Sequence, residues 1–326
     1  MNTQQLIYYA TLAPSGHNTQ PWKFSVEENV IRIYPDFSRR LPVVDPDDHA
    51  LYISLGCALE NLIIAAGQNG LKSNADYFPK DEKEECICIT LAEDGSDDVV
   101  DLYRAIPVRQ SNRSMYDGKE IPDADVQKFI DANVYDTVKI KLFKTNDKKI
   151  EPIIEFVKEG NRNQFNDKQF VEELLSWMRF SKKEVRDRND GLTAEVMGFP
   201  FVPRWLGRNI IKIFAKPESE ATKCEKQIRS SSVMILLIGK KNDKKHWVDI
   251  GRSFERLALK ATSLGIAHAH VNMPCEVVSV REKLSHHLGL KEDEQPLLLI
   301  RFGYANELPR SPRRPVKEIM SPTYNN

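Results

Sequence analysis

The sequence predicts an α+β fold, in which short strands and longer helices follow one another along the chain. Three features indicate this. Two short strands, Trp22–Val26 and Val30–Tyr34, are separated by a two-residue turn and form a hairpin signal. The run Val233–Gly239 is short and wholly apolar, as expected of a central strand covered on both faces. Apolar stripes with helical spacing occupy residues 45–70 and 247–264.

The first helix is expected over Thr3–Leu12 and ends before Pro14, because the residue before a proline is pushed out of the helical region. A second helix is expected after Asp45, which can cap it, with Pro46 at the first helical position. Gly70 suits the end of this helix. Its apolar stripe consists of Leu51, Leu55, Ala58, Leu59, Leu62, Ile63 and Ala66.

Further along, the pattern predicts a strand over Cys86–Leu91, an acidic turn EDGSDD and a short helical stretch at 102–106. The segment RQSNRSMYDGKEIP resembles a loop. Helices are expected at 122–132 and, more loosely, over 148–186 with a break near Gly160. A strand in IAHAHV, a short helix after Pro274 and a strand in PLLLIRFGY precede a basic tail.

The segment MGFPFVPRWLGR, residues 197–208, mixes large apolar side chains with two prolines and two glycines. It is expected to be irregular. Long irregular segments of this kind are buried connectors or active-site lids, and both interpretations stay open.

Composition limits the classes of function. The 326 residues are 41% hydrophobic and 29% charged, enough for one large domain or two modest ones. The 47 basic and 47 acidic residues cancel, so no overall field attracts nucleic acid or an anionic membrane. An anionic ligand must therefore be bound by a local cluster of charges.

The five cysteines are an odd number and lack CxxC spacing, which argues against a disulfide framework and against a zinc site. The amino terminus lacks the basic and apolar regions of a signal peptide, and no later apolar run is expected to be long enough to span a bilayer. The expectation is a cytoplasmic protein without a membrane partner.

Two groups of residues carry candidate chemistry. In RQSNR, Arg109, Ser111 and Arg113 alternate, so in an extended segment they share one face. Two guanidinium groups with a hydroxyl between them suit a terminal phosphate dianion. The alternative is an ordinary solvated loop with two arginines.

The second group is the loop PSGHNTQPW, in which polar side chains and exposed amides lie between a helix end and a strand. Such groups can bond the carbonyl and nitrogen edge of a planar heterocycle. In the alternative interpretation the loop is a rigid turn in which Asn18 and Gln20 satisfy backbone groups. His17 is either a proton donor or an ordinary polar wall residue.

These two segments carry a resemblance. APSGHNTQPWKF resembles the APSxxNxQPW segment of the nitroreductase family, and RQSNR matches that family's RxSxR phosphate motif. The stretch DFSRRLPVVDPDDHALYISLGCALENLIIAAGQNG, the closing LLLIRFGYANELPRSPRRPVKE and the LGR near Gly207 are similar to the Acg-like branch. The resemblance spans nearly the whole chain and is weakest between about residues 135 and 195.

The resemblance also implies an architecture. In ordinary members the phosphate motif precedes the APS segment, and each flavin site is completed across a homodimer interface. Here the order is reversed, which implies an internal pseudo-dimer with a mostly antiparallel sheet flanked by helices. Residues 1–103 would form the half with the ring-binding loop, and residues 104–326 the half with the phosphate clamp. One complete FMN site is expected, with a lid candidate at 195–210.

Residue roles follow from the same resemblance. His268 and His270 alternate on a strand that would pass the flavin, where one can donate to the ring; as core residues they need no ligand role. No catalytic side chain and no metal are expected, because flavin carries the chemistry. The residues assigned to the cofactor are Ser15, Gly16, His17 and Asn18 in the loop, Arg109, Ser111 and Arg113 in the motif, His268 and His270 in the strand, and Arg313 and Arg314 in the tail. The alternative for Arg313 and Arg314 is an ordinary solvated basic tail.

The expected function is an FMN-binding oxidoreductase that uses NAD(P)H to reduce nitroaromatic or quinone-like acceptors, acting as a monomer or weak homodimer. The main alternative is a flavin-sequestering protein whose lid prevents turnover. A nucleic-acid-binding role through the basic tail lacks an aromatic and basic platform. No GxGxxG opens a helix after a strand, which argues against a Rossmann dehydrogenase.

Overall fold

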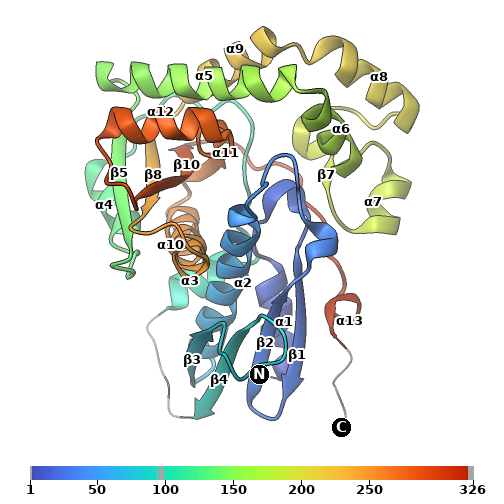
Figure 1. Cartoon of the computed structure of the whole chain (residues 1–326), viewed down its shortest axis with the longest axis vertical. Coiled ribbons are helices and arrows are strands. Elements are labelled where there is room, and N and C mark those ends of the chain that lie inside the picture. The colour runs from blue at the N-terminus through green and yellow to red at the C-terminus, as the bar shows by residue number, and fades with distance from the viewer. Residues whose placement is uncertain (1, 94, 96–98, 322–326) are drawn as a thin grey trace.

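The computed structural model describes residues 2–93, 95 and 99–321 and contains two antiparallel sheets of four strands each (Figure 1). The first sheet has the order β1-β2-β4-β3. Its strands are β1 (Trp22–Glu27), β2 (Val30–Pro35), β3 (Leu71–Tyr77) and β4 (Ile87–Glu93). The second sheet has the order β5-β8-β10-β9. Its strands are β5 (Val138–Lys144), β8 (Val233–Gly239), β9 (Ala267–His270) and β10 (Gln295–Gly303).

The two sheets repeat one topology. In each, the first two strands along the chain are neighbours, and the fourth strand lies between the second and the third. Helix α2 (His49–Gln68) joins β2 to β3, and α10 (Lys244–Ser263) joins β8 to β9 in the same way. Helix α1 (Thr3–Thr11) precedes β1 as α4 (Asp123–Ile130) precedes β5. The chain is therefore an internal pseudo-dimer with an α+β fold, in which each half has its own sheet.

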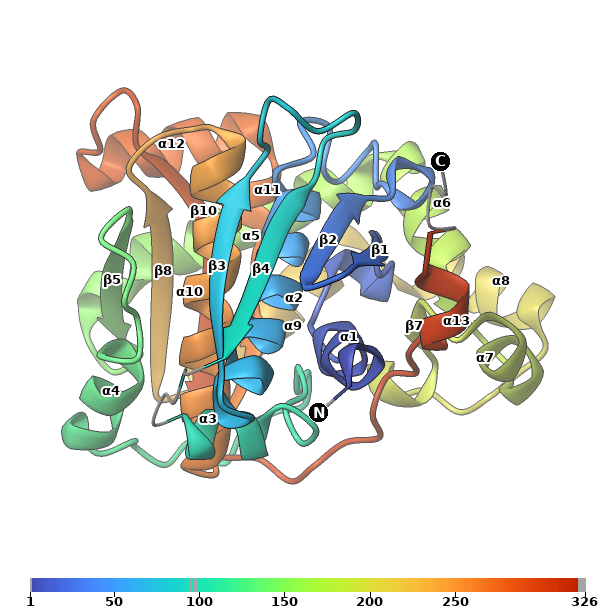
Figure 2. The ribbon, with the colours of Figure 1, turned by 90° about the horizontal axis from the view of Figure 1, so that it is seen from below.

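The central helices α2 and α10 pack side by side, as Figures 1 and 2 both show, and their contact is reciprocal. A Cβ added to Gly56 would lie 2.0 Å from the carbonyl oxygen of Val248, and one added to Gly251 would lie 1.9 Å from that of Ile53. Each glycine thus faces the residue three positions before the other glycine. This exchange is the signature of a two-fold, isologous interface.

One hydrophobic core runs through both halves. It contains Phe24 and Ile33 of the first sheet, Leu55 of α2, and Ile235 and Phe302 of the second sheet, all fully buried. Helix α2 is apolar on almost every side because it is covered by a sheet and by α10 together. A continuous core of this kind joins the halves into a single packed body.

The second half carries a long insertion between β5 and β8, where the first half has only the turn of a hairpin. The insertion lies along one end of the molecule in Figure 1. It contains η3 (Lys148–Ile150), α5 (Glu151–Asn166), α6 (Lys168–Trp177), β6 (Met178–Arg179), α7 (Lys182–Arg188), β7 (Leu192–Thr193), η4 (Glu195–Met197), α8 (Arg204–Phe214) and α9 (Pro217–Arg229).

Two expectations for the insertion were wrong. Helix α5 continues through Gly160 and ends at Asn166. Gly160 does not break the helix; its missing side chain lets the helix pack against the backbone of Met273. The segment 197–208 is not irregular throughout, since α8 begins at Arg204 directly after Pro203. Proline there sets the entry angle and needs no hydrogen-bonding N–H.

Most other elements agree with the sequence within a few residues, but several were missed. These are the strands β3, β5, β6 and β7 and the helices α9 and α13. The second helix also starts later than expected, at His49 and not at Pro46. Asp45 still caps it from a preceding turn, because its carboxylate accepts from the amides of Ala50 (3.0 Å) and Leu51 (2.9 Å). The acidic turn EDGSDD falls largely outside the described residues.

Remaining elements are α3 (Val100–Ala105), α11 (Met273–Glu276), α12 (Val278–Leu288), α13 (Val316–Ile319), η1 (Gly16–Asn18) and η2 (Phe37–Arg39). The expected boundary between halves, 103/104, falls inside α3. Helix α2 is long and apolar enough to cross a membrane, which the sequence analysis overlooked. However, 89% of its apolar window is buried inside the protein, so this is weak evidence for a membrane span.

Candidate functional site

Four segments that are far apart in the sequence meet around one cavity of about 670 Å³, counting its open mouth. The lining comes from the loop after α1, the RQSNR segment, the carboxyl-terminal tail and the insertion. It consists of Leu12, Pro14, Ser15, Asn18, Ile106, Pro107, Arg109, Gln110, Ser111, Arg113, Leu192, Val196, Pro309, Arg310, Ser311 and Arg313.

The loop after α1 is held rigid by its own polar side chains. The hydroxyl of Ser15 accepts from the amide of Gln20 at 2.9 Å. His17, Asn18 and Gln20 all have positive φ, between 45° and 55°, which is unusual for residues with side chains. Backbone strain of this kind is concentrated at functional sites, where the surrounding structure imposes it.

The RQSNR segment is anchored against the second sheet. Ser111 forms a bridge with His268 of β9, and the amide of Asn112 donates to the carbonyl oxygen of His268 at 2.8 Å. Arg301 of β10 is fully buried and donates to the carbonyl oxygens of Asn112 (3.2 Å) and Ser114 (2.8 Å). These contacts fix the backbone that carries Arg109 and Arg113.

Four arginines line the cavity, Arg109 and Arg113 from the RQSNR segment and Arg310 and Arg313 from the tail; Arg310 lies near Glu307, and the other three carry the argument below. Arg109 and Arg313 both donate to the carbonyl oxygen of Leu12, at 3.0 and 3.1 Å, which ties the motif and the tail to the end of α1. Arg313 also donates to the side-chain oxygen of Asn18 at 2.9 Å. Among the described residues, the Arg113 side chain has no hydrogen bond and no ion pair. Arg113 is therefore the cation available to an incoming anion.

The cavity carries a surplus of positive charge in a buried setting. The only carboxylate close to the three arginines among the described residues is Glu255 of α10, 3.2 Å from Nε of Arg109 but not aligned for a hydrogen bond. Burial raises the pKa of Glu255 and the nearby Arg109 opposes the rise. Burial and then Arg109 lower the pKa of Arg313 to about 9. A bound anion relieves this repulsion among cations.

Three imidazoles lie behind the arginines. Burial and then the Arg113 cation lower the pKa of His17 to about 4. The pKa of His270 falls to about 3 because of burial, Arg113 and Arg109, and that of His268 falls well below its usual value. At neutral pH all three rings are uncharged. Nδ1 of His17 and both ring nitrogens of His268 lack a hydrogen-bond partner among the described residues.

Of the residues expected at the site, Ser15, Asn18, Arg109, Ser111, Arg113 and Arg313 line the cavity, and the three histidines lie beside the arginines. Two do not line it. An added Cβ at Gly16 would face Leu41, and Arg314 turns away to the carbonyl oxygens of Gln20 and Glu318.

The side chain of Asn18 is fully used by the protein. Its amide nitrogen donates to the carbonyl oxygens of Gly191 and Pro312, each at 3.1 Å. Gln20 similarly donates to Asn189 and accepts from the amide of Arg314. Both residues satisfy backbone groups, as the rigid-turn interpretation expected, and Asn18 also orients Arg313.

Sequence reasoning missed Glu255, Arg310 and Leu192 at this site, and it included Val196 only within the lid candidate at 195–210. Arg310 belongs to the basic tail that was noticed, so the signal was present but incompletely used. Leu192 and Val196 come from the insertion and have no motif. Glu255 is one carboxylate in a helix of mixed composition, and nothing local distinguishes it.

The pseudo-two-fold axis relates this cavity to a place with different side-chain pairing. Aligning α2 and α10 from their first residues pairs Gly56 with Gly251 and Glu60 with Glu255. Glu60 is fully paired, with Arg252 at 2.7 Å, Arg256 at 2.9 Å and the hydroxyl of Tyr135 at 2.6 Å. The place related to the cavity is thus filled by side chains of the protein itself.

Comparisons with known proteins agree with these motifs. No family model matches the chain. A protein of Mycobacterium tuberculosis H37Rv, provisionally named NAD(P)H nitroreductase Rv3131, is 25% identical over 326 aligned residues, covering 97% of this chain and 90% of the relative. A second, provisionally named NAD(P)H nitroreductase acg from the same strain, is 22% identical over 96% of this chain and 93% of its own length.

Solved structures give partial likenesses. The FMN-dependent nitroreductase NfnB of Mycobacterium smegmatis in complex with NADPH is 14% identical, with a TM-score of 0.44, over 68% of this chain and 97% of that chain. A Bacteroides fragilis nitroreductase with bound FMN is 19% identical, with a TM-score of 0.39, over 63% of this chain and 88% of that chain. The near-full-length sequence relatives and the two motifs support the nitroreductase superfamily for this chain, and the relatives include proteins named acg.

Proposed function

We propose that the cavity holds one FMN per chain and that the protein is a cytoplasmic NAD(P)H-dependent oxidoreductase that reduces small electron-poor acceptors such as nitroaromatics or quinones. The observation that carries this is the meeting of Arg109, Ser111, Arg113 and Arg313 with the loop after α1 at one cavity. The names of the sequence relatives, NAD(P)H nitroreductase, support the activity. All five cysteines are free thiols, which supports a reducing compartment.

The residues present fit a flavin mononucleotide. Three guanidinium groups face a single nearby carboxylate, so the site has a positive surplus that suits a phosphate dianion. Nη1 of Arg109 and Nε of Arg313 are buried without a hydrogen-bond partner among the described residues, and so can donate to a ligand. Apolar side chains such as Leu12, Leu192 and Val196 supply a wall for a planar ring.

Each group has a distinct task. Bound flavin would supply the hydride chemistry between a nicotinamide and an acceptor. Arg113, Ser111 and Arg109 would hold the phosphate, and Ser15 and Asn18 keep the ring-binding loop and Arg313 in place. His17 and His270, uncharged at neutral pH, can donate a hydrogen bond without adding to the crowded positive charge. Val196, in the lid candidate at 195–210, borders the cavity and limits access of water.

We also propose that residues 1–103 and 104–326 act as the two halves of one site and that the chain works as a monomer or weak homodimer. The reciprocal packing of Gly56 and Gly251 supports this, because the interface that would join two subunits is already formed within the chain. Size-exclusion chromatography with light scattering tests it. A stable dimer at micromolar concentration would contradict this assignment.

The cofactor proposal is tested by purifying the protein, identifying the released flavin by mass and measuring its molar ratio to chain. Replacing Arg109 and Arg113 by alanine removes two charge-assisted contacts, each worth roughly 1.5–3 kcal/mol, so FMN binding is expected to weaken more than about 100-fold. The matched control replaces two outward-facing arginines, Arg186 and Arg229, whose side chains are 77% and 44% exposed. Equal flavin content in both double variants would exclude the assigned phosphate site.

The activity is tested separately from binding. Anaerobic addition of NADPH or NADH to the flavin-loaded protein is expected to bleach the flavin, and a nitroaromatic or quinone is expected to restore its colour. A flavin that stays oxidised under both nucleotides would instead indicate the sequestering role, which no name among the relatives supports.

A further inference from the structure

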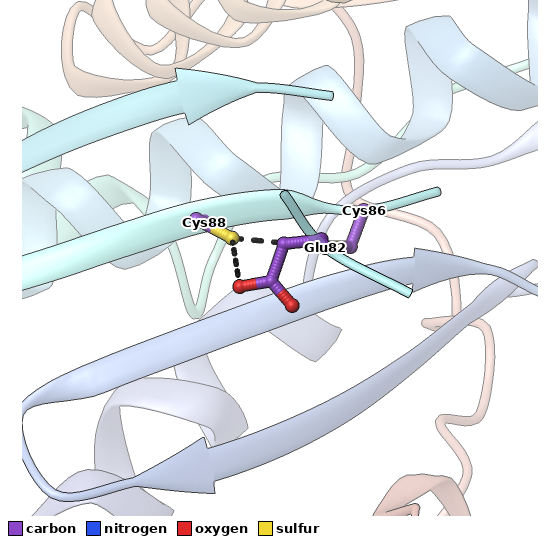
Figure 3. A group of neighbouring side chains, drawn as sticks. All are labelled: Glu82, Cys86 and Cys88. Atoms are coloured by element: carbon purple, nitrogen blue, oxygen red, sulfur yellow. Dashed lines mark hydrogen bonds between the residues drawn. The ribbon is translucent and has the colours of Figure 1, made fainter. Parts of the chain in front are cut away.

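A cluster of two thiols and a carboxylate lies on the first sheet, away from the cavity. Cys86 directly precedes β4 and Cys88 lies in it, while Glu82 belongs to the loop between β3 and β4 (Figure 3). The Sγ atoms of Cys86 and Cys88 are 3.6 Å apart, and Sγ of Cys88 is 3.4 Å from Oε1 of Glu82. One ligand atom from each residue lies within 4.8 Å of the other two.

The strand geometry produces this cluster. Side chains alternate across a strand, and Ile87 and Ile89 are fully buried in the core. Cys86 and Cys88 therefore share the opposite face. The loop returns over that face and is closed by a hydrogen bond of 2.9 Å from the amide of Phe78 to the carbonyl oxygen of Cys86. Figure 3 shows Glu82 turned from this loop toward Cys88.

The spacing matches a tetrahedral metal site. For Zn–S of about 2.3 Å and Zn–O of about 2.0 Å, the edges of a tetrahedron are about 3.8 Å between two sulfurs and about 3.5 Å between sulfur and oxygen. The observed separations of 3.6 and 3.4 Å lie within a few tenths of an ångström of these edges. Only a small inward or outward shift of side chains would be needed to accept the ion.

The charges around the cluster are also suitable. Two thiolates and one carboxylate around a divalent cation leave one net negative charge, and the Arg32 guanidinium balances it, with Nε 2.8 Å from Oε1 of Glu82. An outer residue that holds a ligating carboxylate in this way is typical of metal sites. Without a cation, burial and then the neighbouring Cys86 and Glu82 raise the pKa of the Cys88 thiol. A raised pKa favours the protonated thiol, whereas a bound metal favours the thiolate and releases the thiol protons.

The other cluster of this type among the described residues, Asp45, Asp47 and His49, differs in one respect. Its third member is itself a cation, because hydrogen bonds to Asp45 and Asp47 raise the pKa of His49 to about 9 against the effect of burial. Both clusters have an arginine on a carboxylate, Arg281 on Asp47 and Arg32 on Glu82, but neither Cys86 nor Cys88 has a hydrogen-bonded cation among the described residues.

We propose that Cys86, Cys88 and Glu82 form a binding site for a thiol-preferring divalent cation of the zinc class, with the fourth position open to water. This site is independent of the proposed flavin chemistry. It revises the expectation drawn from the missing CxxC pattern, because the two cysteines are separated by one residue and the third ligand comes from the preceding loop.

The test uses the full-length flavin-loaded protein, freed of metal with a chelator and kept reduced with a phosphine. Zinc(II) is added, and the metal that stays with the chain after gel filtration is measured by mass spectrometry. The wild type is expected to retain one zinc ion per chain, and Cys86→Ser and Cys88→Ser to lose it. The matched control is Cys224→Ser, which alters a partly buried thiol outside the cluster.

Two further variants keep the test decisive if a cysteine variant fails to fold. Glu82→Gln changes only the loop ligand, and Arg32→Gln removes the outer partner, which is expected to weaken zinc binding about tenfold. Cobalt(II) provides a second readout, because thiolate ligation gives a charge-transfer band visible in the difference spectrum against the flavin. A wild-type chain that retains no zinc, or a Cys88→Ser chain that retains as much as Cys224→Ser, would overturn the proposal.

Discussion

At the scale of single residues, the same carboxylate has two different fates in the two halves. Glu60 and Glu255 occupy equivalent positions on α2 and α10, and both are fully buried. The cations Arg252 and Arg256 outweigh the effect of burial and lower the pKa of Glu60. Burial raises the pKa of Glu255, and its ion-pair partner Arg109 does not outweigh this effect. A buried polar group that is incompletely paired marks the half of the molecule where a ligand can still enter.

Residue roles were predictable only where a short motif carries them. RQSNR and the loop after α1 identified Arg109, Ser111, Arg113 and Ser15, all of which line the cavity. Glu60 and Glu255 are each one glutamate in an apolar helical stripe, and the sequence cannot say which one attracts two arginines. The partners of a buried charge are decided by tertiary packing.

A buried histidine at the start of α2 should make stability depend on pH. Burial lowers the pKa of His49, but hydrogen bonds to Asp45 and Asp47 outweigh this and raise it to about 9. The protonated ring therefore stabilises the folded state. Because the folded pKa lies above the unfolded value of about 6.5, this contribution is complete below pH 6.5 and is lost as the pH rises through about 9.

The expected loss in the free energy of unfolding between about pH 6 and about pH 9.5 is about 3 kcal/mol at most, since Asp47 also pairs with Arg281 and shares the interaction. Urea unfolding at the two pH values measures it. His49→Gln should flatten the difference, whereas His246→Gln, at the start of α10, should leave it unchanged. An equally steep pH dependence in His49→Gln would show that other groups cause it.

At the scale of elements, the crossing of α2 and α10 depends on two glycines. A Cβ at Gly56 would lie 2.0 Å from a backbone oxygen, so the helices must separate to accept it. Gly56→Ala and Gly251→Ala are each expected to lower the free energy of unfolding by about 3 kcal/mol, and by similar amounts because the contact is reciprocal. Chemical denaturation of the purified variants measures both.

Gly118→Ala is the matched control for this substitution. Gly118 has φ of +77° and nothing within 4 Å of an added Cβ, so only backbone strain of about 1–2 kcal/mol is expected. If Gly56→Ala were no more destabilising than Gly118→Ala, the close crossing of the two helices would be incorrect.

Two of the missed strands, β3 (Leu71–Tyr77) and β5 (Val138–Lys144), lie at the edges of their sheets. Strand β3 alternates exposed polar residues with partly buried ones, and its apolar content is too low to identify it by itself. Strand β5 alternates Val138, Ile140 and Leu142 with lysines, a strand pattern that was overlooked. Strand β8 is buried along its whole length, and its continuous apolar run made it evident. Central strands can be predicted from composition, whereas edge strands depend on the neighbour they pair with.

At the scale of the whole molecule, the family resemblance predicted the pseudo-dimer through the reversed order of two motifs. It did not predict that the sheet would be divided into two. The repeated strand order and the reciprocal glycines supply a physical reason: each half keeps its own sheet, and the two halves meet through helices. Low similarity between the halves hid this repeat, because a shared topology needs only similar patterns of burial.

A shared core implies that the two sheets unfold together. The core containing Phe24, Ile33, Ile235 and Phe302 is continuous across the pseudo-dimer, so opening one sheet exposes apolar surface of the other. Helix α8 contrasts with this, since Trp205, Ile213 and Phe214 are 60–69% exposed and Gly207 is its only buried residue. Regions with few buried contacts open with a small free energy, whereas core strands open only with global unfolding.

Hydrogen exchange measured by mass spectrometry tests this contrast on the full-length chain. Amides of β4 in the first sheet and β8 in the second are expected to exchange with the same opening free energy, equal to that of global unfolding, while those of α8 exchange much faster. Gly56→Ala should speed exchange in β4 and β8 by the same factor, because it weakens the crossing on which both depend. A variant in which β4 loses protection while β8 keeps it would mean that the halves fold independently.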